Sequence, residues 1–120
     1  MREITTHRVH GLNDALTITV LDAPGAGNAC HEYMVTYGPG PADMQMIGFQ
    51  QGLISVAGVN GISNEALLAI VRDRLECFQA GDYACEENEE ALDCVTHAME
   101  KLAARTRGRL ARGVEDTHQP

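Results

Sequence analysis

A run of basic residues near the end of the chain is the first candidate for a binding site. The segment KLAARTRGRLAR, residues 101–112, holds five of the nine Lys and Arg residues and no acid. The whole chain is acidic, with 17 Asp and Glu residues and a formal net charge of −8. Guanidinium groups bind carboxylates and phosphates through charge-assisted hydrogen bonds. The segment therefore predicts a small anion-binding site on an otherwise acidic protein.

The spacing of these arginines predicts which of them face a partner. A helix from about Cys85 to about Arg112 would carry one stripe of residues at alternating spacings of four and three. The stripe consists of Ala91, Val95, Ala98, Leu102, Arg105, Arg109 and, slightly off-centre, Arg112. An arginine on a packing stripe is shielded and needs an anionic partner, for which a carboxylate of another element and a bound phosphate would both serve. Gly108 weakens the helix between the arginines.

Signals for catalysis and for metal binding are weak. His7 and His10 stand three residues apart without a carboxylate or cysteine pattern, so we expect no metal site. Ser55 and Ser63 lack the glycine pattern of a nucleophile elbow. The cysteines form no C-x-x-C pair, and we expect them to be reduced and buried. They are Cys30, Cys77, Cys85 and Cys94. We therefore expect neither an enzyme nor a bound metal or cofactor.

Composition narrows the class of protein. A chain of 120 residues is the size of one domain, small enough that oligomerisation could complete its core. The negative charge argues against binding of duplex nucleic acid, whose affinity comes mainly from neutralised phosphates. The apolar runs are too short to span a membrane, and the first residues lack the pattern of a signal peptide. We expect a cytosolic protein without membrane contact.

The expected elements divide the chain into two parts. Period-two alternation in DALTITVLD predicts a strand, and HEYMVTY and MQMIGFQ follow as further strands of a meander, linked through QG to LISVAG. Helical spacing follows, with Ser63 as N-cap of a first helix and Gly81 at its end. We expect an α+β fold in one domain spanning residues 1–120. It would have a small N-terminal antiparallel β-sheet at 1–58 and a C-terminal two-helix hairpin at 59–120.

Longer phrases of the sequence resemble a known family. The phrases are HRVHGLNDALTITVLDAPGAGNACHEY, GVNGISNEALLAIVRDRLECFQAGDYACEEN and AARTRGRLARGVEDTHQ. Together they look like the phage Thoeris anti-defence sponge proteins, which share a helical-hairpin domain with the phage anti-CBASS sponges. The resemblance covers nearly the whole chain and is strongest from Val59 onward.

The resemblance implies a protein that traps an immune signal and does not cleave it. Family members bind cyclic ADP-ribose made by a bacterial TIR-domain enzyme, and some also bind cyclic di- or trinucleotides of the CBASS system. It further implies a phage-encoded protein of the host cytoplasm that forms dimers and hexamers. The ligand-binding positions of the family match Phe78, Asn88, Arg105, Arg109 and Arg112 in this sequence.

Four positions depart from the family pattern. The resemblance implies an arginine where Glu86 stands, a phenylalanine at Tyr83, a glycine at Asp116 and an aromatic residue near Met99. An acid beside a phosphate pocket repels the ligand. Either Glu86 faces solvent, as its helical angle indicates, or the preferred ligand differs.

Helix length constrains the pocket. Asn88 and Arg105 lie 17 residues apart, or about 25 Å along a helix axis, whereas a compact nucleotide is about 10 Å across. If both residues touch one ligand, the arginine comes from a second chain, so we expect at least a homodimer. Two other functions stay open: a small nucleotide-processing enzyme, and a structural or host-protein-binding adaptor whose arginines pair with carboxylates.

Overall fold

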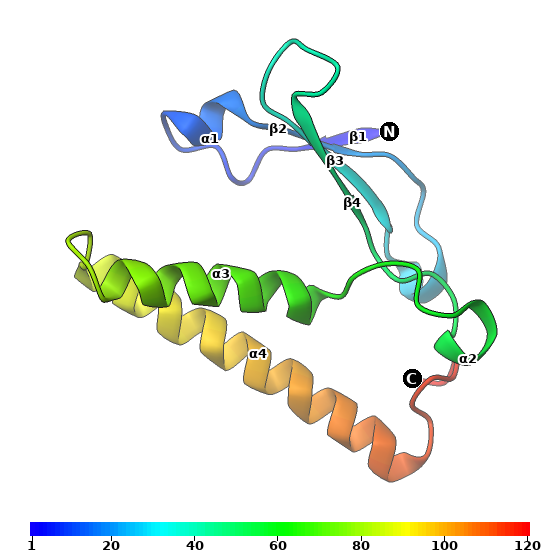
Figure 1. Cartoon of the computed structure of the whole chain (residues 1–120). Helices are drawn as coiled ribbons and strands as arrows, with labels where there is room; N and C mark the ends of the chain where they lie inside the picture. The colour runs from blue at the N-terminus through cyan, green and yellow to red at the C-terminus, as the bar shows by residue number, and fades with distance from the viewer. The chain divides into compact units, whose positions relative to one another are not determined.

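The computed structural model describes residues 1–120 and has an α+β fold, with a sheet in the first half and two long helices in the second (Figure 1). This confirms the predicted fold class. The chain forms two compact units, one made of Met1–Gly52 with Val56–Ile62 and the other of Leu53–Ser55 with Ser63–Pro120. The prediction that the chain folds as a single domain stays a prediction.

Four antiparallel strands form a meander in the order β1-β2-β3-β4. They are β1 Arg2–Ile4, β2 Thr17–Val20, β3 Glu32–Thr36 and β4 Met44–Gly48. Alternate residues of a strand face one side of the sheet, and the register sets Ile18 opposite Val35 and Val20 opposite Tyr33. Val20 is fully buried, and the rings of Tyr33 and Phe49 meet edge to face at 5.6 Å. This apolar face is the core of the first unit.

Three short segments connect the strands and lead out of the sheet. They are α1 at Leu12–Ala15, a 3₁₀ turn at Ala26–Asn28 and α2 at Ile54–Ala57. The expectation that LISVAG continues the meander is wrong, because residues 54–57 are helical. The chain instead pairs Phe49 with Ile62 in a parallel bridge. The fourth strand is β1, which is too short to show an alternating pattern and exists through its pairing with β2.

Helices α3 (Asn64–Gln79) and α4 (Glu86–Arg112) lie side by side, joined by a short turn, as the sequence predicts (Figure 1). The hydroxyl of Ser63 accepts a hydrogen bond from Ala66 N at 3.1 Å, which confirms the predicted N-cap. Gly81 directly follows Ala80, the C-cap of α3, so it stands at the predicted end of the helix, but it does not adopt the left-handed conformation of a glycine cap. Gln79 closes the turn instead, accepting from Cys85 N at 3.0 Å and donating to Cys85 O at 3.1 Å.

The packing face of α4 is rotated from the predicted stripe. Its centre runs through half-buried and buried residues at alternating spacings of four and three. They are Asn88, Leu92, Val95, Met99, Leu102, Thr106 and Arg109. Val95, Ala98, Leu102 and Arg109 of the predicted stripe are covered, as predicted, whereas Ala91, Arg105 and Arg112 are exposed. The centre of the covered face is therefore displaced by about 50° of rotation from that of the predicted stripe. A face centred on Leu92 and Met99 removes more apolar area from water than one centred on Ala91 would.

Few apolar side chains are fully covered. Val20 and Cys30 are the only buried apolar residues of the chain. The other three cysteines are exposed, which corrects the expectation of buried thiols, and all four are unpaired. The reason is architectural: in a two-helix hairpin each helix has one covered face, so Cys77 on α3 and Cys94 on α4 fall outside it.

Candidate ligand site

The five predicted ligand-binding residues lie at two places along the hairpin. Phe78 and Asn88 flank the turn between α3 and α4, whereas the three arginines belong to the last turns of α4. Since α4 is continuous from Glu86 to Arg112, Asn88 and Arg105 are separated by about 25 Å along its axis. One chain therefore does not gather the five residues into one site.

At the turn, four side chains form a group that we call the hairpin-turn cluster: Arg74, Phe78, Tyr83 and Asn88. The rings of Phe78 and Tyr83 meet edge to face at 6.4 Å, and Asn88 Nδ2 donates to the Tyr83 carbonyl at 3.3 Å. The guanidinium carbon of Arg74 lies 5.6 Å from the centre of the Phe78 ring. Phe78 is 39% exposed and Tyr83 is 77% exposed, so both rings are open to a planar ligand.

Sequence reasoning did not assign a role to Arg74 or Tyr83 in ligand binding. The signal for Arg74 is its position four residues before Phe78, which places both on the same side of α3. Glu86, the acid that the family pattern does not have, is exposed. It precedes Asn88 by two residues and so points about 160° away from it around α4.

Of the three arginines predicted to bind the ligand, Arg105 and Arg112 are accessible. Arg105 is exposed and makes no hydrogen bond or ion pair within the chain. Arg112 is exposed and donates a single hydrogen bond, from Nη2 to the Pro120 carbonyl at 2.8 Å. The shielding expected from the predicted stripe is therefore wrong for these two residues and right for Arg109.

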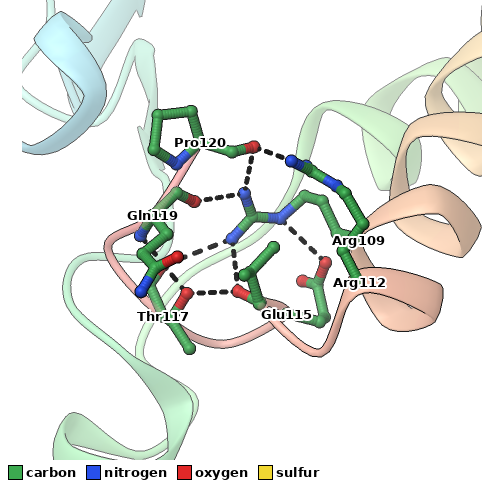
Figure 2. Close-up of polar contacts among 7 residues, drawn as sticks. Arg109, Arg112, Glu115, Thr117, Gln119 and Pro120 are labelled. Atoms are coloured by element: carbon green, nitrogen blue, oxygen red, sulfur yellow. Dashed lines mark hydrogen bonds and ion pairs between the residues drawn. The ribbon is translucent and has the colours of Figure 1, made fainter.

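Arg109 is 6% exposed and is enclosed by the segment that follows α4 (Figure 2). Its Nε donates to Glu115 Oε2 at 3.1 Å, and its Nη1 and Nη2 donate to backbone carbonyls. The carbonyls belong to Val114, Thr117, Gln119 and Pro120, at 2.8, 3.3, 2.5 and 2.8 Å. The sequence left open whether the partner of Arg109 is a carboxylate of another element or a bound phosphate. In the structure it is the carboxylate of Glu115, in the segment after α4.

Asp116 fastens the same segment to the start of α2. Its carboxylate accepts from Ile54 N at 2.7 Å and from Ser55 N at 3.0 Å. A hydrogen bond with the Ser55 hydroxyl, together with these backbone donors, holds the pKa of Asp116 below its usual range. The residue has φ of 57°, a conformation that glycine adopts most easily. This explains why glycine, which the family resemblance implies here, suits the position, and aspartate is among the few other residues that tolerate it.

No group of three or more His, Cys, Asp or Glu side chains is arranged to hold a metal ion. Neither α4 nor any shorter helix combines the length and the apolar content that a membrane crossing requires.

Comparison with known proteins found one similar sequence. A stretch of 73 residues is 41% identical to Thoeris anti-defense 1 of Bacillus phage SBSphiJ7. Over the aligned residues this similarity supports the resemblance to Thoeris anti-defence proteins. The aligned residues are 61% of this chain and 51% of that protein, so the chain spans about half the length of the curated relative that it matches. No family model matches the chain.

Replacement of Arg109 tests whether this buried arginine serves the fold. We expect Arg109→Ala to lower the free energy of unfolding by about 2 to 3 kcal/mol, because it removes the charge-assisted hydrogen bonds that hold the segment after α4. Arg107→Ala, an exposed neighbour without partners, is the matched control and should change stability by less than about 0.5 kcal/mol. Urea unfolding measures both, and equal stabilities would contradict a structural role for Arg109.

The lowered pKa of Asp116 predicts a dependence of stability on pH. A carboxylate whose pKa is lower in the folded state stabilises the fold above its ordinary pKa of 3.8, and this contribution is lost as pH falls through the folded value. Asp116→Asn tolerates the same backbone conformation but carries no charge. The melting temperature of the variant should fall below that of the parent at pH 7, and the gap should narrow below pH 3.8. A gap that stays constant down to pH 2 would argue against this role.

Proposed function

We propose that the chain is a phage anti-defence protein that acts against Thoeris immunity by binding a cyclic ADP-ribose signal and sequestering it without cleavage. The observation that carries the proposal is the 41% identity to Thoeris anti-defense 1. The hairpin supports it chemically, because it presents exposed aromatic rings at one end and unpaired guanidinium groups at the other.

The predicted ligand-binding residues have different roles in the proposed complex. The Phe78 ring stacks on the adenine base, and Asn88, whose Nδ2 is held by the Tyr83 carbonyl, offers its Oδ1 as an acceptor. Arg105 supplies charge to the pyrophosphate, since its guanidinium has no partner within the chain. Arg109 acts indirectly, by ordering the segment beside Arg112.

The proposed pocket is completed by a second chain. The separation of about 25 Å between Asn88 and Arg105 exceeds the size of a nucleotide, so the arginine of one chain meets the turn of another. A two-fold dimer then contains two equivalent pockets. The exposed apolar side chains of α3 support association, because Ile70 and Val71 are 58% and 44% exposed. A homodimer is the minimum assembly, and a hexamer is built from dimers.

The first test measures binding and recovery together. The protein is incubated with cyclic ADP-ribose isomers and with cyclic di- and trinucleotides, and binding is measured by calorimetry. The bound ligand is then released by heat and analysed by chromatography, where we expect it to be intact. A cleaved product that accumulates beyond one per site would support a nucleotide-processing enzyme instead. Absence of binding across the panel would favour an adaptor whose arginines contact another protein.

Replacement of Arg105 tests the phosphate contact. We expect Arg105→Ala to weaken binding by about 1.5 to 3 kcal/mol, the range for a charge-assisted hydrogen bond, without loss of stability. Arg107→Ala makes the same change in net charge and should alter binding little. Equal losses in the two variants would mean that only net charge matters.

Mixed assemblies test the shared pocket directly. Co-expression of Phe78→Ala chains with Arg105→Ala chains, each with its own tag, yields mixed dimers. In these dimers one pocket carries both substitutions and the other carries neither. Half of the binding capacity should return in the mixed dimers, whereas a pocket formed within one chain would leave both sites defective.

A further inference from the structure

Arg74 is a basic side chain near the turn of the hairpin that has no role in the proposed function. Of the nine Lys and Arg residues, three form ion pairs with carboxylates: Arg8, Arg72 and Arg109. Arg74 alone lies over an aromatic ring, with its guanidinium carbon 5.6 Å from the centre of Phe78. A cation in this position is attracted to the ring electrons, but the attraction is weak where water has access.

No acidic residue close by in the sequence forms an ion pair with Arg74. Asp73 precedes it, and Asp82 lies in the turn beyond Phe78, yet Arg74 forms no ion pair with any carboxylate. Its neighbour on the same helix, Arg72, lies 2.9 Å from Glu76. The guanidinium of Arg74 is therefore available to an anion from outside the chain.

The helix orientation keeps Arg74 and Phe78 accessible. The side of α3 that packs in the hairpin includes half-buried residues, namely Leu68, Arg72, Leu75 and Gln79. Arg74 and Phe78 are exposed and lie about 100° away from the centre of that side. Tyr83 meets the Phe78 ring at an interplanar angle of 88°, so it does not stack flat on either face of that ring.

We propose that Arg74 is a ligand-binding residue, whose guanidinium covers Phe78 in the free protein and contacts a phosphate of the nucleotide when the base stacks on that ring. The inference rests on the proposed function and adds a cation from the same chain that supplies the stacking ring. A phosphate carries a full charge and accepts two parallel hydrogen bonds from one guanidinium, so it competes effectively with the ring for Arg74. The pocket then holds phosphate from two sides, through Arg74 of one chain and Arg105 of the other.

Substitution of Arg74 tests the inference with cyclic ADP-ribose as the probe. Arg74→Ala should raise the Kd about tenfold or more, and should reduce the slope of log Kd against log salt concentration, because one phosphate contact is lost. Arg74→Lys keeps the charge but not the planar pair of donors, so its Kd should lie between those of the parent and the alanine variant. Arg107→Ala removes the same charge from an exposed site on α4 and should raise the Kd less than about twofold.

The outcomes separate the inference from the proposed function. If the parent binds the probe and Arg74→Ala behaves like Arg107→Ala, the inference fails and the proposed function stands. If the parent does not bind, both fail. Light scattering on each variant provides the remaining check: dissociation of the assembly by Arg74→Ala would assign the residue to a contact between chains and overturn the inference. An unchanged assembly with a tenfold weaker Kd would establish it.

Discussion

The register of α4 controls what each side chain of the hairpin can reach. The helix is uninterrupted from Glu86 to Arg112, so the angle and height of every residue follow from its number. Its covered face runs through Leu92, Val95 and Leu102 and ends on Arg109. Arg105 lies toward the edge of this face and is exposed. A rotation of about 40° and one turn of helix therefore separate Arg109, which serves the fold, from Arg105, which has no partner within the chain.

The distribution of charge along α4 follows from the same geometry. Acids occupy the first turn and arginines the last, which is the arrangement that the helix dipole favours. Most of the cations consequently stand far from the aromatic rings at the turn. Arg74 differs from the cations of α4, because it belongs to α3 and lies over the Phe78 ring. A nucleotide site on this hairpin therefore needs α3 as well as the charged end of α4.

The segment after α4 gives the last two arginines different roles. It places Glu115 and backbone carbonyls around Arg109, and through Asp116 it is joined to the start of α2. These contacts satisfy a guanidinium that would be costly to bury alone. Arg112, only three residues later, keeps most of its donors free. The order of this segment thus depends on Arg109, which the family resemblance implies to be a ligand-binding residue.

The sequence alone determined the strands at β2, β3 and β4, the N-cap of α3 and the extent of α4, because these depend on local periodicity and on capping residues. It also determined the family resemblance. Tertiary structure decided the rest. Strand β1 exists through pairing with β2, and α2 replaces an expected strand. The covered face of α4 is centred on residues that include Leu92 and Met99, and it leaves Ala91 exposed, because packing favours burial of the larger apolar side chains. The partners of Arg109 come from the segment after α4, and a spacing rule within one helix carries no information about them.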